Sequence, residues 1–141
     1  MRSLLHEAPG KLSFTVDGWT SPATHAFLGI TVHWIDEQWR LRELLLDFVP
    51  LCGSHTAENL TSEFIATCDK FDILPKILAI TTDGASTNDA FLGGVEKVCS
   101  DRGIAFSKKD GHVRCAELSC SCDQQRRTEA SEPDSCRSCR K

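Results

Sequence analysis

Two strand-like segments of this chain each run directly into an Asp-Gly pair. Residues 11–17 (KLSFTVD) alternate polar and apolar side chains, as a half-buried strand does, and they end at Asp17. Residues 76–82 (KILAITT) form a nearly continuous apolar run, which is typical of a strand covered on both faces, and Asp83 follows them. The pattern therefore predicts two hydrophobic strands, each with an aspartate at its C-terminal end.

The rest of the chain predicts a mixed α/β domain with the order strand, strand, strand, helix, strand, helix, strand. The third strand alternates at first, but the run Leu44-Leu45-Leu46 also allows a helix there. Loop-forming residues predict breaks at residues 18–25 and 50–54. The expected strands cover residues 11–17, 26–35, 39–49, 76–82 and 111–117, and the expected helices cover residues 56–71 and 88–101.

The order of these elements predicts where the two carboxylates lie. Short connections make the first three strands antiparallel neighbours, and a right-handed helical crossover makes the fourth strand parallel to the first. If these two strands are neighbours, Asp17 and Asp83 lie side by side at the carboxyl edge of the sheet. Ligands of open α/β sheets bind at that edge.

Two neighbouring carboxylates point to a divalent cation. Close carboxylates repel each other, and a hard ion such as Mg²⁺ or Mn²⁺ relieves this repulsion because it prefers oxygen ligands. Asp17 and Asp83 are the predicted ligands, and Asp89 is the spare carboxylate that a stand-alone metal nuclease would recruit. The alternative is that each Asp-Gly pair only forms a turn.

Length, net charge and the distribution of apolar residues limit what kind of protein this chain can be. The length of 141 residues suits one domain, and the net charge of −4 provides no broad basic face, so DNA binding would need a metal ion or a partner domain. No apolar run reaches the roughly 18 residues of a membrane helix, so no membrane partner is expected. The N-terminus lacks the apolar core of a signal peptide, which favours an intracellular protein with reduced thiols.

Four short sequence motifs resemble those of a known protein family. LSFTVDGWTSP, FLGITVHWID, GSHTAENL and ITTDGASTN follow one another in the order and spacing of the hAT-superfamily transposases. From Lys11 to Cys115 the chain resembles the N-terminal part of their RNase H-like catalytic domain. The resemblance implies a mixed five-stranded sheet, a nuclear location, and Mg²⁺-dependent cleavage and joining of DNA. It also implies that Asp17 and Asp83 are two of three catalytic metal ligands.

Several features depart from the family pattern. Gly84 and Thr87 replace two asparagines of the family motif that begins at Asp83. The family has a Cys-x-x-His motif after the fifth strand, and here Leu118 takes the position of its histidine. The third catalytic ligand (a Glu), the BED-type zinc finger and the dimerisation region have no counterpart. We therefore expect a truncated, catalytically inactive transposase domain, with a frame-shifted tail as one origin of the change near residue 118. The alternative is a domesticated module that binds a protein partner or self-associates.

The expected organisation is an N-terminal extension (1–10), a partial RNase H-like domain (11–118) and a disordered, cysteine-containing tail (119–141). The polar composition of the tail predicts disorder. Its C-x-C and C-x-x-C units offer four thiolates for zinc, and the alternative is that these cysteines have no common role. The candidate zinc ligands are Cys120, Cys122, Cys136 and Cys139.

A few further side chains have two interpretations. Trp19, two residues after Asp17, is either a stacking platform for nucleic-acid bases or a packing residue that fixes the segment. His33 and His55 are expected to be structural. Cys68 and Cys99 lie in apolar segments and are expected to be small core residues.

Overall fold

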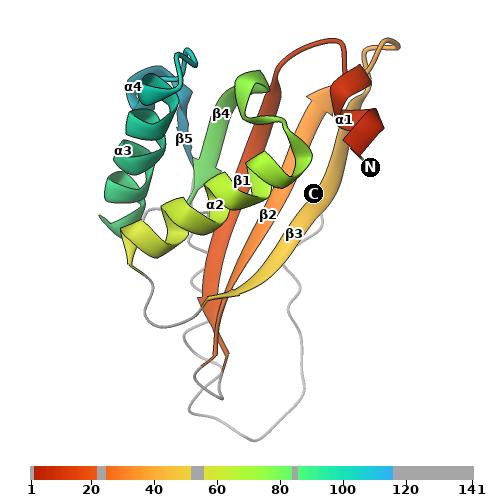
Figure 1. The fold of residues 1–141 in the computed structure, drawn as a ribbon. Coiled ribbons are helices and arrows are strands. Elements are labelled where there is room, and N and C mark those ends of the chain that lie inside the picture. The colour runs from red at the N-terminus through yellow and green to blue at the C-terminus, as the bar shows by residue number, and fades with distance from the viewer. Residues whose placement is uncertain (1, 22–24, 52–55, 84–85, 116–141) are drawn as a thin grey trace, which may run out of the picture.

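The computed structural model describes residues 2–21, 25–51, 56–83 and 86–115 (Figure 1). It confirms the predicted order of elements and adds short helices at both ends of the described chain. The elements are α1 (Arg2–Glu7), β1 (Leu12–Thr20), β2 (Ala26–Ile35), β3 (Leu41–Leu51), α2 (Ala57–Phe71), the 3-10 turn η1 (Leu74–Lys76), β4 (Ile77–Thr82), α3 (Ser86–Asp101), α4 (Lys108–Gly111) and β5 (His112–Arg114).

The five strands form one mixed sheet in the order β3-β2-β1-β4-β5. β1 pairs with β2 and β2 with β3 in antiparallel fashion, whereas β4 is parallel to both β1 and β5. The predicted α/β class and the neighbourhood of β1 and β4 are therefore confirmed. The third segment is a strand, so its helical alternative is wrong.

Strands β1, β3 and β5 differ most in extent from the prediction. β1 continues to Thr20, because Gly18 to Thr20 still pair with β2 after the pairing with β4 has ended. β3 continues through Pro50 to Leu51, because β3 is an edge strand and the missing N–H of proline is tolerated there. β5 is only three residues long, and residues 116–141 lie outside the described part of the chain.

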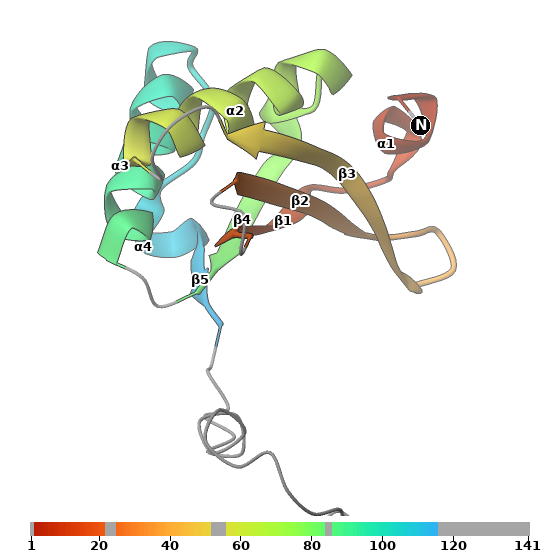
Figure 2. The same ribbon diagram turned by 90° about the horizontal axis from the view of Figure 1, so that it is seen from below.

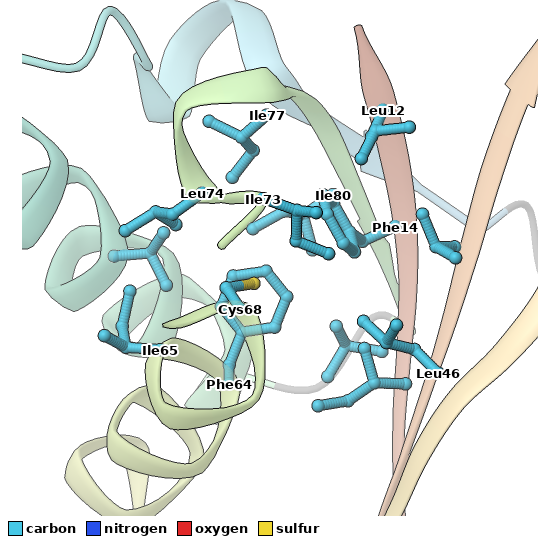
Figure 3. Close-up of a cluster of buried hydrophobic side chains, with 14 of the residues drawn as sticks. Leu12, Phe14, Leu46, Phe64, Ile65, Cys68, Ile73, Leu74, Ile77 and Ile80 are labelled. Carbon is cyan, nitrogen blue, oxygen red and sulfur yellow. The ribbon is translucent and has the colours of Figure 1, made fainter. Parts of the chain in front are cut away.

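Helices α2 and α3 lie together on one face of the sheet (Figures 1 and 2). Alternate side chains of the central strands point into the space beneath these helices and are fully buried, as Figure 3 shows for Phe14 and Ile80. Phe64 of α2 packs edge-on to Phe14 at 5.4 Å and to Phe91 of α3 at 5.7 Å between ring centroids. These aromatic contacts join the sheet to both helices.

No described element covers the opposite face of the sheet. Leu78 of β4 and Val113 of β5 are 56% and 49% exposed. The prediction that residues 76–82 are covered on both faces is therefore wrong for the described residues. Ile77 and Ile80 are both buried although they are three residues apart, and the pairing of β4 with β1 has a register shift between Leu12 and Ser13.

The caps and the small core residues follow from local chemistry. The Thr56 hydroxyl accepts a hydrogen bond from the Asn59 N–H at 3.3 Å and begins α2, and Asp72 in the left-handed conformation ends it. Cys68 and Cys99 are fully buried, as expected, and burial raises the pKa of both thiols.

The first ten residues include α1, which packs against the core through the fully buried Leu5. Its C-terminal end is held by Lys76, whose ammonium group donates to the carbonyls of Leu5 (2.9 Å), His6 (3.0 Å) and Ala8 (2.7 Å). A cation at the C-terminus of a helix satisfies carbonyls that have no partner within the helix. Among the helices of the described residues, none has the length and apolarity needed to cross a membrane.

Candidate metal site at the carboxyl edge of the sheet

The pairing of β1 with β4 sets the relation between Asp17 and Asp83. Thr15 pairs with Thr81 in this parallel ladder, and each aspartate follows its threonine by two residues. Because side chains alternate along a strand, Asp17 lies on the same open face as Thr15. Both aspartates are exposed. The fold therefore brings the two predicted ligands to one edge of the sheet.

The position of Asp17 within its strand differs from the prediction. Asp17 is not the last residue of β1 but lies three residues before its end, opposite Gly29 of β2. The prediction was wrong because Gly18 looked like a strand break, whereas the antiparallel ladder with β2 accommodates it. Asp83 does follow the last residue of β4, as predicted.

Hydrogen bonds from two neighbouring elements hold Asp83. The Asn88 side chain of α3 donates to the Asp83 carboxylate and, at 3.3 Å, to its backbone carbonyl. The Thr82 hydroxyl donates to the same carbonyl at 3.2 Å and lies 3.1 Å from Nε2 of His112 in β5. A hydroxyl has one proton, so His112 must donate to Thr82 through Nε2. Asp83 is thus tied to both α3 and β5.

An aromatic cluster lies next to Asp17 on the open face. The Trp19 ring packs against Phe48 of β3 (5.1 Å between centroids) and against Phe27 of β2 (6.2 Å). It also covers Gly29, where an added Cβ would come within 3.2 Å of Trp19 Cζ3. The packing interpretation of Trp19 thus has specific contacts, although 41% of the residue stays exposed.

The donor set at this edge suits a hard divalent cation. Carboxylate oxygens are the ligands that Mg²⁺ and Mn²⁺ prefer, and Mg²⁺ commonly binds one or two carboxylates while it keeps several waters. Among the residues that the structure describes, no group of three His, Cys, Asp or Glu side chains converges for a metal. The residues therefore fit a two-carboxylate site that leaves most of the coordination shell to water.

The spare carboxylate Asp89 has another partner. Its carboxylate lies 2.6 Å from the Lys108 ammonium group, and this contact holds the pKa of Asp89 below its usual value. A carboxylate neutralised in this way is a poorer metal ligand than a free one. We therefore do not assign Asp89 to the site.

The remaining candidates fall into two groups. His33 lies 3.0 Å from the Thr15 hydroxyl and 3.8 Å from the Glu43 carboxylate, which are contacts of a structural residue. His55 and the candidate zinc ligands lie outside the described residues; the latter are Cys120, Cys122, Cys136 and Cys139. Sequence reasoning missed the contacts of Asn88 with Asp83 and of His112 with Thr82, because they depend on the turn into α3 and on the pairing of β5 with β4.

Comparisons with known proteins identify the family of this chain. Residues 15–108 match the family model of the ZBED1 RNase-like domain. The chain is 31% identical to a protein named putative AC transposase from Zea mays over 114 residues, which are 79% of this chain and 14% of that protein. It is 37% identical to a putative transcriptional regulator, tpeD, from Talaromyces stipitatus over 87 residues, which are 62% of this chain and 10% of that protein.

Among solved structures, RuvC of Thermus thermophilus matches 66% of this chain and 57% of its own chain, with 15% sequence identity and a TM-score of 0.40. The chain spans only about a tenth to a seventh of the length of the two curated relatives named above. The family model nevertheless covers most of this chain. The chain therefore belongs to the family of ZBED1 RNase-like domains, which are hAT-type, transposase-derived domains with an RNase H-like fold.

Proposed function

We propose that this chain is a transposase-derived RNase H-like domain that binds Mg²⁺ or Mn²⁺ through Asp17 and Asp83 and contacts DNA, but does not cleave DNA by itself. The observation that carries this proposal is the pairing of Thr15 with Thr81, from which both aspartates follow by two residues. The nucleus is the compartment that a DNA-contacting function favours.

The metal half of the proposal rests on the two carboxylates. A divalent ion between them would offset their mutual repulsion, and Asn88 would orient Asp83 through its side-chain amide. When bound, such an ion supplies a positive charge that attracts a phosphate group of DNA. Asp17 and Asp83 would hold such an ion, and because both side chains are exposed, a phosphate could approach it from solvent.

The proposed lack of DNA cleavage rests on the number of metal ligands. In-line cleavage of a phosphodiester needs both the attacking and the leaving oxygen to be stabilised, and pairs of closely spaced ions do this in many nucleases. The described residues bring only Asp17 and Asp83 to the site, and Asp89 pairs with Lys108. Each ~1.4 kcal/mol of lost transition-state stabilisation slows a reaction tenfold, so an incomplete ligand set is expected to abolish turnover.

A calorimetric titration with Mn²⁺ tests the metal site. We expect the parent chain to bind Mn²⁺ and the variants Asp17→Asn and Asp83→Asn to lose this binding, whereas Asp101→Asn keeps it because Asp101 is an exposed residue at the far end of α3. No binding to the parent would mean that the two aspartates are only structural. Metal-dependent DNA cleavage that Asp17→Asn abolishes would overturn the proposed lack of DNA cleavage.

The open face of the sheet favours a second function, the binding of a protein partner or self-association. Four large apolar side chains on strands β3, β4 and β5 are about half exposed; they are Leu45, Phe48, Leu78 and Val113. Exposed apolar patches on soluble domains often mark interfaces. Light scattering after size-exclusion chromatography at several concentrations tests self-association, and a mass that stays monomeric would argue against it.

A further inference from the structure

A cluster of basic side chains surrounds a hollow between α3, α4 and β5. The hollow has a volume of about 500 Å³, and its lining residues are Asp89, Glu96, Lys108, Lys109, His112 and Arg114. The pair Lys108-Lys109 is too short a run to indicate a DNA-binding surface in the sequence. The fold adds Arg114 from β5, so the cluster exists only in the folded chain.

Two cations of this cluster are available to a ligand. Lys108 is paired with Asp89, and Glu96 accepts the backbone N–H of Lys108 at 3.0 Å. Lys109 and Arg114 are exposed and have no ion pair among the described residues. The lining thus holds three cations and two carboxylates, which leaves one net positive charge. Arg114 also lies close enough to Asp89 to help lower the pKa of that carboxyl, but it forms no direct ion pair with it.

The neighbouring His112 does not add a positive charge at neutral pH. Its partial burial lowers the pKa of the imidazole, and the Arg114 guanidinium lowers it further. The neutral ring donates through Nε2 to Thr82, as the hydrogen-bond pattern requires. His112 therefore fixes β5 against β4 and leaves the charge of the hollow to lysine and arginine.

The cluster has a fixed position relative to Asp83. Arg114 pairs with Thr82, the residue just before Asp83, and the N–H of Cys115 donates to the Thr82 carbonyl at 2.9 Å. The Thr82 hydroxyl in turn donates to the Asp83 carbonyl. A ligand held by Arg114 would therefore lie near Asp83, one of the two candidate metal ligands.

A hollow at the opposite end of the sheet has an acidic lining. A second hollow of about 620 Å³ lies between α1 and the turn that joins β2 to β3, and its charged lining residues are Glu7, Asp36, Glu37, Arg42 and Glu43. Asp36 is paired with Arg42 at 2.7 Å, so three glutamates remain there. The linings of the two hollows therefore differ in the sign of their charge, and the basic lining is the better match for a polyanion.

We infer that Lys109 and Arg114, supported by Lys108, bind phosphate groups of a nucleic-acid backbone and position that backbone beside Asp83. This inference rests on the DNA contact in the proposed function and assigns it to named residues. A guanidinium binds a phosphate through two parallel hydrogen bonds, and lysine adds a point charge. Phosphate is the favoured ligand because a cation at Asp17 and Asp83 would attract the same backbone.

The test is the salt dependence of DNA binding in the presence of EDTA, measured with a fluorescent 20-nucleotide duplex. The slope of log K against log salt falls by roughly 0.9 for each phosphate contact that is removed, so the double variant Lys109→Ala/Arg114→Ala should lose about two units of slope. The matched control is Arg2→Ala/Arg40→Ala, which removes two exposed cations from the opposite end of the sheet. We expect this control to keep nearly the parental slope.

Two further measurements sharpen the assignment. Arg114→Lys keeps the charge but loses the planar fork, so it should keep the slope and bind more weakly. In the unmodified chain, the backbone amide signals of Lys109 and Arg114 should shift when the duplex is added, a readout that needs no variant to fold.

Three results would overturn the inference. They are no binding of the duplex by the parent at low salt, equal losses of slope in both double variants, and equally good competition by polyglutamate per unit charge. Because EDTA is present, none of them depends on the metal site. Mn²⁺ binding without DNA binding would remove the phosphate cluster and leave the metal half of the proposed function in place.

Discussion

Asp17 of β1 lies opposite Gly29 of β2 in the antiparallel ladder, three residues before β1 ends. Gly29 has no side chain, and the ring of Trp19 occupies the space that a Cβ would need. The Asp17 backbone is thus held on one side by β2, whereas on the other side the pairing with β4 ends at Thr15. The Asp17 carboxylate therefore lies just beyond the last β1–β4 pair, on the side of β1 that faces Asp83. A metal ion bound to both aspartates would link β1 to β4, so its binding should be measurable as a gain in stability.

Metal binding should stabilise the fold. A ligand that binds only the folded state at 100 times its dissociation constant adds about 2.7 kcal/mol to the free energy of unfolding. We expect Mn²⁺ to produce such a shift in thermal unfolding of the parent and none in Asp17→Asn or Asp83→Asn. Without metal, Asp17→Asn should unfold close to the parent because the carboxylate is exposed. Asp83→Asn keeps a side-chain oxygen that can accept the hydrogen bond from Asn88, so its stability should also change little. A full Mn²⁺ shift in Asp17→Asn would contradict the site.

The aromatic cluster beside Asp17 should contribute to stability. Replacement of Trp19 by alanine removes its ring contacts with Phe27 and Phe48, and aromatic pairs of this kind contribute about 0.5–1.5 kcal/mol each beyond area burial. We therefore expect Trp19→Ala to lower the free energy of unfolding by roughly 1–3 kcal/mol in urea titrations. Trp39→Ala is the control, because Trp39 is 89% exposed, and it should change stability little. Equal effects of both changes would argue against packing by Trp19.

Much of the fold follows from sequence periodicity. The β-branched and aromatic composition of residues 26–35 predicted β2 with its observed bounds, and the helical spacing of Leu60, Phe64 and Cys68 predicted the buried side of α2. These patterns succeed because one face of each element is buried against a single core, so the side-chain period is imposed by geometry.

The errors share a physical cause. Gly18 and Pro50 are poor strand residues in isolation, and the neighbouring strand decided their conformation through ladder pairing. Leu78 lies in an apolar run, yet its exposure depends on what covers the other face of the sheet. The sequence also predicted both aspartates of the candidate site but not the contact from His112, since that contact depends on the register of β5 against β4.

Lys76 should hold the N-terminal helix to the domain. Its ammonium group donates to three carbonyls at the end of α1, and hydrogen bonds to charged groups contribute about 1.5–3 kcal/mol. We expect Lys76→Met to release α1, seen as faster amide hydrogen exchange in Arg2–Glu7, while Phe64 and its neighbours stay protected. Lys97→Met serves as control because Lys97 is an exposed residue of α3. Unchanged exchange in Lys76→Met would show that the buried Leu5 alone holds the helix.

The turn between β2 and β3 should make stability depend on pH in the acid range. The Asp36 carboxylate accepts the backbone N–H groups of Arg40 and Gln38, both at 2.9 Å, and pairs with Arg42 at 2.7 Å. The Arg40 N–H, followed by the Arg42 guanidinium, lowers the pKa of Asp36 below its ordinary value of 3.8. The stabilisation is therefore present above pH 3.8 and is lost as the pH falls through the folded-state pKa, because the unfolded chain then binds the proton more readily.

The variant Asp36→Asn tests this expectation. It should be less stable than the parent in urea at pH 7, and the difference should shrink as the pH falls below about 4, where the parent loses the same interactions. Asp101→Asn changes an exposed aspartate that forms no ion pair with another described residue, and it should show no such convergence. A difference in stability between Asp36→Asn and the parent that instead stays constant from pH 7 to pH 3 would contradict this expectation. That result would mean that the charge of Asp36 does not stabilise the turn and that only the shape of its side chain does.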